Sequence, residues 1–181
     1  MTAGPEISSA ARGDGSPGLR RKDREITDPG EIRDILDRSD SCRIGFAADS
    51  VPYIVAMSFG YRWDDRLVLY FHCAREGRKL ALMEKNDRVC FQMDIDHALI
   101  RGKRACDWGM GYRSLAGTGR LSRVADGVEK REGLDRIMAH HGSRGPHEYE
   151  PRIFDATEVL RLEVEAFSGK EKKARSDNSF D

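Results

Sequence analysis

The period of the hydrophobic pattern changes along the chain, and these changes separate predicted helices from predicted strands. Ile32, Ile35 and Leu36 lie at helical spacing. They follow Asp28, a favourable N-cap residue, with proline at the first helical position and Glu31 three residues later. Three helices are expected: one that starts at Asp28 and ends at Ser39–Ser41, one over residues 77–85, and one over residues 126–141.

A period of two, typical of strands with one buried face, appears in the remaining segments. Leu160, Leu162 and Val164 alternate with Arg161 and Glu163 in the clearest example. Neighbouring strands are joined by short turns, which favours an antiparallel meander over a β-α-β series. We therefore expect a mainly β fold, a small six-stranded β-barrel with peripheral helices. The expected strands cover residues 42–46, 53–59, 67–73, 88–94, 112–124 and 157–164, with irregular chain at 95–110 and 142–156.

Composition confines the expected domain to the middle of the chain. Residues 1–24 contain mostly Gly, Pro, Ser, Arg and Asp, and residues 169–181 are mostly charged and polar. Neither segment can bury enough apolar surface to offset the entropy lost on ordering. We therefore expect a folded domain over residues 25–168, between a disordered N-terminal extension and a flexible charged tail.

The charge balance argues against nucleic acid as a partner. Lys and Arg total 31, as do Asp and Glu, so the formal net charge is zero. No segment is apolar enough for a membrane span or a signal peptide, and the four cysteines form no C-x-x-C pair. We therefore expect a reduced, cytoplasmic protein without membrane contact.

The segment from Leu69 to Leu82 carries the strongest chemical signal. It is predicted to be a strand that runs into a helix, with His72 at the junction and Arg78 and Lys79 in the first helical turn. Unpaired N–H groups at a helix N-terminus attract anions, and two cationic side chains add to this attraction. A phosphate-bearing ligand with His72 beside it is therefore predicted; a structural histidine and a solvated basic helix face are the alternatives.

Three other histidines, His140, His141 and His147, do not indicate a metal site. Adjacent residues on a helix point about 100° apart, so they cannot easily share an ion. No H-E-x-x-H pattern accompanies them. We expect no bound metal.

The order of these motifs resembles the flavin-binding split-barrel family typified by pyridoxamine 5′-phosphate oxidase, above all its nitroimidazole-resistance branch. The likeness covers about residues 20–168. The segments that carry it are Arg21–Ile26, Pro52–Gly60, Tyr70–Lys79, Asn86–Phe91, Cys106–Trp108 and Tyr112–Ser114.

This resemblance implies a homodimer with FMN in the crevice between the subunits. Where the oxidases hold the FMN phosphate with Ser-Arg-Lys, this chain has Gly77, Arg78 and Lys79, which keeps both cations and lacks the serine hydroxyl. The resemblance also places His72 and Cys73 near the flavin. Along the flavin ring it places Ala56, Met57 and Ser58.

Adjacent strand residues point to opposite faces, so His72 and Cys73 cannot both turn their side chains to the cofactor. We favour His72 as the group that faces the cofactor, with Cys73 as a buried, unreactive thiol. Trp108 and Tyr112 are candidates to cover a flat ring or line a dimer groove, with plain packing as the alternative. Ser114 is a candidate hydrogen-bonding partner of the cofactor.

The leading hypothesis is an FMN-dependent oxidoreductase that reduces a small, electron-poor substrate such as a nitroaromatic or nitroimidazole, with His72 as catalytic proton donor. One alternative is a non-catalytic split barrel that binds flavin, deazaflavin or haem. Another is a structural dimer with an empty crevice. The substrate-binding C-terminal region of the oxidases has no counterpart after Val164, so oxidation of vitamin B6 is not expected.

Overall fold

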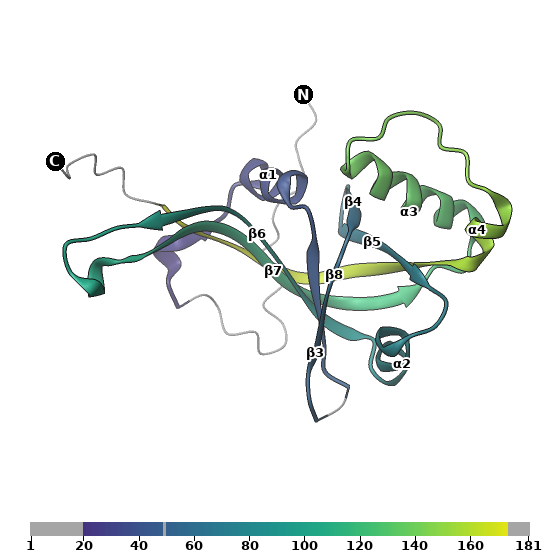
Figure 1. The fold of residues 1–181 in the computed structure, drawn as a ribbon, viewed down its shortest axis with the longest axis horizontal. Coiled ribbons are helices and arrows are strands. Elements are labelled where there is room, and N and C mark those ends of the chain that lie inside the picture. Colours follow the sequence, from purple (N-terminus) through teal and green to yellow (C-terminus); the bar gives the residue numbers. More distant parts are fainter. Residues whose placement is uncertain (1–19, 49, 174–181) are drawn as a thin grey trace.

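The computed structural model describes residues 20–48 and 50–173, which fold around one twisted antiparallel sheet (Figure 1). The strands are β1 (Glu25–Ile26), β2 (Cys42–Phe46), β3 (Tyr53–Met57), β4 (Phe59–Trp63), β5 (Leu67–Ala74), β6 (Arg88–Ile100), β7 (Gly109–Arg123) and β8 (Thr157–Lys172). The helices are α1 (Pro29–Arg38), α2 (Arg78–Lys85), α3 (Gly127–His140) and α4 (Pro151–Ala156), with 3-10 turns η1 (Lys22–Arg24) and η2 (Ala105–Asp107). Seven strands follow the order β3-β2-β6-β7-β8-β5-β4, and β1 pairs with β8. The predicted class, mainly β with helices on the outside, is confirmed.

The two end strands of this order, β3 and β4, are consecutive in the chain and separated by Ser58 alone. Met57 pairs with Cys42 of β2, whereas Phe59 pairs with Phe71 of β5. One extended segment therefore changes partners at a single residue and joins both ends of the hydrogen-bonded path. The result is a split barrel, in which the chain, and not a ladder of hydrogen bonds, connects the two edges.

Helix α1 forms where the capping pattern predicted it. The Asp28 carboxylate accepts a hydrogen bond from the Glu31 N–H at 2.9 Å. Ile32, Ile35 and Leu36 are fully buried where α1 lies against β6 and β7. The helical spacing in the sequence therefore identified the buried face of this helix.

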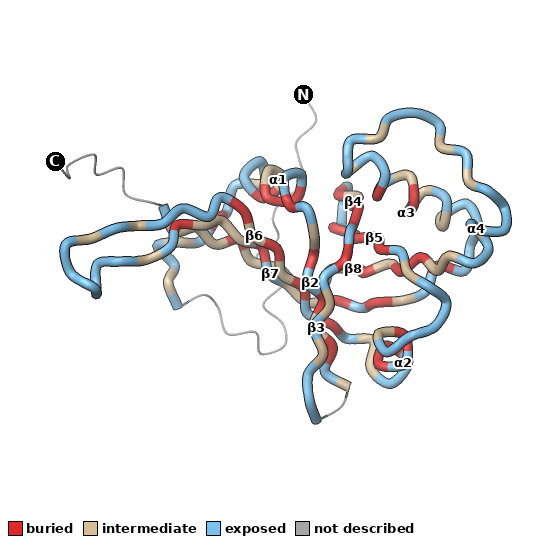
Figure 2. Tube along the Cα trace, in the orientation of Figure 1, coloured by how far each residue is buried: buried red, intermediate tan, exposed pale blue. Residues whose placement is uncertain are grey.

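Two apolar clusters lie on opposite faces of β5. Leu69 and Phe71 belong to the main cluster inside the barrel, whereas Val68 and Tyr70 belong to a smaller cluster beneath α3. This division follows from the alternation of side chains along a strand. Figure 2 shows the buried chain concentrated where the strands cross, and exposed chain along the β6–β7 extension and the loop before α4.

Two glycines let α3 approach the sheet closely. A Cβ atom at Gly60 would lie 2.3 Å from the carbonyl carbon of Arg136, and one at Gly133 would lie 2.9 Å from Cδ1 of Tyr70. Distances this short do not occur between non-bonded carbons, so a side chain at either position would displace the helix. The backbone of β4 thus lies directly beneath the helix at Gly60.

Strands β6 and β7 continue past the barrel as a two-stranded arm, at the left of Figure 1. We define the arm as residues 96–111. It begins at a register shift between Ile95 and Ala98, and it exposes Leu99 and Trp108 by 52% and 51%. The irregular segment predicted at 95–110 was therefore wrong at both of its ends, which are paired strand. Backbone hydrogen bonds between β6 and β7 hold these residues in strand conformation. Residues 96–99 are exposed, so the sequence shows no alternation of apolar and polar residues there.

An ionic ring secures the base of the arm to α1. Arg38 and Arg113 each form ion pairs with both Asp34 and Asp96. Asp96 has a φ of 58°, a left-handed conformation that aspartate adopts more readily than most residues. The ring therefore joins the helix, the bulge and β7 at one point.

Other boundaries also differ from the predictions. Residues 59–63 form a separate strand because the partner changes at Ser58, and residues 151–156 within the predicted loop form α4. With β1 and β4 added, the sheet has eight strands instead of six. Strand β8 continues four residues past the predicted domain end at 168 and pairs with β7 there. The predicted terminal segments otherwise fall mainly on residues 1–19 and 174–181, which lie outside the described chain.

Candidate functional site

An open pocket of about 500 Å³ lies where the β3–β4 junction meets the end of β5, the start of α2 and the start of β8. We call it the junction pocket. Six residues singled out in the sequence line it, although they come from three separate segments of the chain. Its lining comprises Val55, Ala56, Met57, Ser58, His72, Cys73, Ala74, Lys79, Ala156 and Thr157.

The change of strand partner at Ser58 builds one wall of the junction pocket. Met57 is buried in the main cluster, and its neighbours Ala56 and Ser58 are exposed. Strand β3 is an end strand that pairs only with β2 among the described strands, so its outer edge carries unpaired backbone N–H and C=O groups. This edge can form hydrogen bonds with a flat heterocycle.

His72 and Cys73, which precede Ala74 at the end of β5, point to opposite faces. Cys73 is half-buried and packs against the main cluster, and burial raises the pKa of its thiol, so the thiol stays protonated near neutral pH. His72 pairs with Val159 of β8 and is exposed. The accessible imidazole of the pocket lining is therefore that of His72.

Helix α2 begins with an uncapped turn beside the pocket. Its N-cap residue, Gly77, has a φ of 141° and no side chain to cap the helix. The Gly77 carbonyl accepts hydrogen bonds from the N–H groups of Leu80 and Ala81 at 3.1 and 3.2 Å. The N–H groups before these have no acceptor within the helix, which makes this end favourable for an anion.

The two cations of this turn point in different directions. Lys79 is half-buried and lines the junction pocket. Arg78 is exposed, and its guanidinium lies 4.7 Å from the centre of the Tyr53 ring at the start of β3. Arg78 therefore stacks outside the pocket lining, and Lys79 is the cation that faces the pocket.

Comparison with known proteins decides the family. A sequence model described as pyridoxamine 5′-phosphate oxidase matches residues 28–171. The chain belongs to the pyridoxamine 5′-phosphate oxidase family. No curated protein matches the sequence at a significant level.

Solved structures agree with this assignment. A Bacteroides thetaiotaomicron protein, provisionally named for 5-nitroimidazole antibiotic resistance, is 30% identical with a TM-score of 0.70 over 81% of this chain and 86% of that chain. This match confirms the predicted likeness to the nitroimidazole-resistance branch of the oxidase family. Flavocytochrome Anf3 from Azotobacter vinelandii shares the fold at 20% identity, with a TM-score of 0.69 over 86% of this chain and 72% of that one. An FAD- and haem-binding protein from Mycobacterium smegmatis does so at 17% identity, with a TM-score of 0.70 over 86% and 77%.

Three residues lie away from the junction pocket although the sequence predicted them near the cofactor. Trp108 is on the arm and donates its indole N–H to the Gly102 carbonyl at 2.9 Å. Tyr112 pairs with Lys172, and the Ser114 hydroxyl donates to the Lys170 carbonyl at 3.5 Å. None of the three lines the junction pocket of its own chain.

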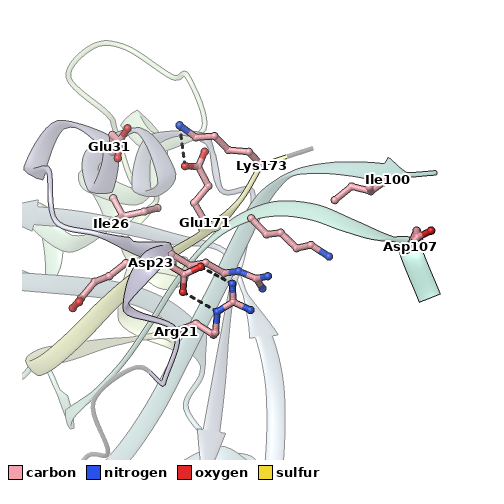
Figure 3. A pocket seen from close by; sticks show the side chains of 11 residues that line it. Arg21, Asp23, Ile26, Glu31, Ile100, Asp107, Glu171 and Lys173 are labelled. Carbon is pink, nitrogen blue, oxygen red and sulfur yellow. Dashed lines mark hydrogen bonds and ion pairs between the residues drawn. The ribbon is translucent and has the colours of Figure 1, made fainter. Parts of the chain in front are cut away.

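A second open groove of about 650 Å³ lies at the base of the arm and includes the Arg21–Ile26 segment that carried part of the family resemblance. Figure 3 shows two ion pairs among its charged side chains, Arg21 with Asp23 and Lys173 with Glu171. Arg21 binds Asp23 through two hydrogen bonds, which lower the pKa of that carboxyl to about 2, and Lys173 pairs with Glu171. The lining has four cationic and five anionic side chains, so it does not favour a phosphate, and we do not assign the cofactor here.

His140 acts as a hydrogen-bonding group of the fold. His140 places Nε2 2.8 Å from the Ser39 carbonyl and thereby connects α3 to the end of α1. Among residues 20–48 and 50–173, no three His, Cys, Asp or Glu side chains are grouped so that they could hold a metal ion. In the same part of the chain, no helix has the length and apolar character needed to cross a membrane.

Residues of the pocket that the sequence did not indicate have no reactive side chains. Val55, Ala74, Ala156 and Thr157 contribute shape and backbone groups. Their place in the sheet is the one signal that could have indicated them. Strand β8 begins opposite the end of β5, where Thr157 pairs with Ala74.

Proposed function

We propose that the junction pocket binds FMN and that the protein is a flavin-dependent oxidoreductase for small, electron-poor substrates such as nitroaromatic compounds. The observation that carries this proposal is the convergence of Ala56, Met57, Ser58, His72, Cys73 and Lys79 on one pocket. Their separation in sequence means that the fold, and not local chain proximity, brings them together.

The residues fit a flavin at both ends of the molecule. Lys79 and the free N–H groups after Gly77 suit the phosphate. The unpaired edge of β3 suits the polar rim of the ring system, and buried Met57 lies between the exposed residues of this edge. The missing serine hydroxyl at Gly77 removes one hydrogen bond but leaves the charge complementarity intact.

Bound FMN would supply the redox chemistry, while the protein orients the reactants and manages protons. Lys79 neutralises the phosphate, and the imidazole of His72 donates a ring N–H proton to the reduced substrate. The thiol of Cys73 takes no part, because it is protonated and packs into the core.

A second copy of the chain fits this proposal. The junction pocket is open to solvent on one side, and the arm extends away from the barrel (Figure 1). Trp108 lies on the arm, and Tyr112 and Ser114 follow it on β7. In a homodimer, the arm of one subunit would cover the pocket of its partner and complete the site with these residues. Exposed Leu99 and Trp108 support such an interface.

A non-catalytic binding role for flavin, deazaflavin or haem is the second candidate. The exposed imidazole of His72 at the pocket favours it, because such a group could serve as an axial haem ligand. The names of two proteins that share the fold also mention flavin and haem.

An absorption spectrum of the purified protein, before and after denaturation, tests the proposal directly. We expect flavin bands and the release of FMN, identified by mass. A Soret band would favour the second candidate. A colourless protein that gains no absorbance or thermal stability on addition of FMN would refute cofactor binding, because tight ligands stabilise the folded state.

A further inference from the structure

The loop that follows α3 brings together an acid, a base and a hydroxyl that the flavin site does not use. Asp135, Ser143 and His147 border an open cavity of about 740 Å³ between α3 and residues 142–150. The cavity shares no lining residue with the junction pocket. Figure 1 shows this loop arching from the end of α3 towards α4.

The three side chains form a continuous hydrogen-bonded chain. His147 places Nδ1 3.1 Å from Oδ1 of Asp135 and Nε2 3.0 Å from Oγ of Ser143. An ionised carboxylate can only accept a hydrogen bond, so Nδ1 of the neutral imidazole carries the proton. Nε2 then accepts a hydrogen bond from the Ser143 hydroxyl. This is the order of acid, base and nucleophile found in serine hydrolases of unrelated folds.

Surrounding groups hold the base and the acid in place. The Tyr149 hydroxyl donates to the same Asp135 oxygen at 2.7 Å. Arg131 donates to the His147 carbonyl at 3.4 Å, and its guanidinium lies 5.3 Å from the centres of the Tyr149 and Phe154 rings. The His147 side chain is only 14% exposed, so its imidazole is fixed and largely shielded from water. A fixed, oriented base is what activation of a serine hydroxyl requires.

Charged side chains of both signs line the cavity. Arg131, Arg136 and Arg144 are cationic, Glu132 and Asp135 are anionic, and Arg136 pairs with Glu132 at 3.4 Å. The lining therefore does not require a charged substrate. Backbone turns at Gly142 and Gly145, with φ of 87° and 143°, present Ser143 between them.

We propose that Ser143 is the nucleophile of an acyl-transfer site that hydrolyses small esters. Oγ of Ser143 forms a bond to the ester carbonyl carbon, and Nε2 of His147 takes the hydroxyl proton. Collapse of the adduct breaks the bond to the leaving alkoxide, which receives that proton and departs as an alcohol. Water then attacks the acyl-serine in the same way, releases the carboxylic acid and restores the hydroxyl. Asp135 is a positioning residue, since it acts through His147.

A serine-directed fluorophosphonate and the substrate p-nitrophenyl acetate test the proposal on the full-length protein. We expect the reagent to add once per chain, at Ser143 by peptide mass mapping, and to block ester hydrolysis. Ser143→Ala should abolish both, while Ser50→Ala, which changes an exposed serine outside this cavity, should leave both unchanged. Wild-type protein without an adduct at Ser143, or Ser143→Ala with the wild-type hydrolysis rate, would overturn the proposal.

Variants of His147 and Asp135 distinguish a catalytic role of the hydrogen-bonded chain from a role in stabilising the loop. His147→Gln should slow labelling about 100-fold, within the range of general-base effects. The rate of wild-type labelling should rise with pH, as expected for general-base activation of a hydroxyl, and His147→Gln should lose this rise. Asp135→Asn should change the same pH profile. If these variants lower only the melting temperature and label at the wild-type rate, the hydrogen bonds merely brace the loop and the proposal fails.

Discussion

Met57 and Phe59 are two residues apart in the chain, yet they belong to strands at opposite ends of the sheet. Met57 lies opposite Cys42 and Phe59 opposite Phe71. Ser58 between them is the point where one extended segment leaves one partner and takes another. The exposed backbone created by this exchange forms a wall of the junction pocket, so the feature that splits the barrel is also the feature that builds the proposed site.

Replacement of Lys79 tests the phosphate contact. We expect Lys79→Ala to weaken FMN binding by about 1.5–3 kcal/mol, because a charged hydrogen bond would be lost. Arg78→Ala should have a smaller effect, because its guanidinium stacks on Tyr53 outside the pocket lining. Isothermal titration with FMN measures both changes. Lys22→Ala, which changes an exposed lysine outside the arm and the pocket lining, is the matched control for loss of one positive charge.

Replacement of His72 separates proton donation from cofactor binding. We expect His72→Gln to retain FMN while the rate of nitroaromatic reduction falls about 100-fold, a typical effect of removing a general acid. The measurement is steady-state reduction with flavin occupancy quantified in each sample. A wild-type rate at full occupancy would exclude the proton-donor role, whereas loss of the flavin itself would point to a binding role.

The contact between Gly60 and α3 predicts a large loss of stability on a small change. Gly60→Ala places a Cβ against the Arg136 backbone, so we expect a loss of about 1–3 kcal/mol, as for other overpacked sites. Gly127→Ala, in the first turn of α3 with no atom within 4 Å of the new Cβ, should be neutral or slightly stabilising. Urea denaturation of the two variants gives the comparison. Equal midpoints would show that the helix can shift without cost.

The ionic ring at the base of the arm predicts acid sensitivity. Hydrogen bonds from Arg113 lower the pKa of Asp34, and those from Arg38 and then Arg113 lower the pKa of Asp96. A carboxyl with a depressed pKa in the folded state stabilises the fold above its unfolded pKa of about 3.9. That stabilisation is lost as the pH falls through the lower, folded value.

Urea midpoints measured between pH 6 and pH 2 test this dependence. We expect Asp96→Asn to flatten the acid limb of the curve relative to wild type. Because Arg38, Asp34 and Asp96 are substantially exposed, salt should also weaken the difference between the two proteins. An unchanged acid limb in the variant would mean that the ring contributes nothing to stability.

The cysteines should react with iodoacetamide in an order set by exposure and pKa. Cys90 and Cys106 are exposed. Burial raises the pKa of Cys73, and it raises the pKa of Cys42 to about 12. Since the thiolate is the reactive form, we expect Cys90 and Cys106 to be modified first by peptide mapping. Early modification of Cys73 would contradict its packing against the core.

Local sequence patterns predicted much of this fold because the same caps and apolar positions also stabilise the helices and strands. The cap at Asp28 and the apolar stripe behind it define α1, and the alternation in β5 separates His72 from Cys73. The strand-to-helix junction at residues 72–79 placed several pocket residues correctly in relation to one another, because a short connection keeps its ends close.

The rest depended on relations that no local pattern carries. Nothing in the alternation from Tyr53 to Trp63 marks Ser58 as a change of partner, since the period of two continues through it. The hydrogen-bonded trio of Asp135, Ser143 and His147 depends on how one loop folds back on α3, and no sequence motif marks it. The different directions of the Arg78 and Lys79 side chains depend on the position of the Tyr53 ring at the start of β3.

The missing side chains at Gly60 and Gly133 have a mechanical consequence. At Gly60 the strand backbone contacts the backbone of α3, and at Gly133 the helix backbone contacts the Tyr70 ring. No flexible side chain separates α3 from the sheet at these two points, so close packing opposes movement of the helix there. We therefore expect the helix and the two strands under it to move as one rigid unit. One end of this unit bears the loop with Ser143, and β5 carries His72 close to its own end. Changes of chemistry at either end are then expected to come from substituted side chains and not from movement of α3 against the sheet.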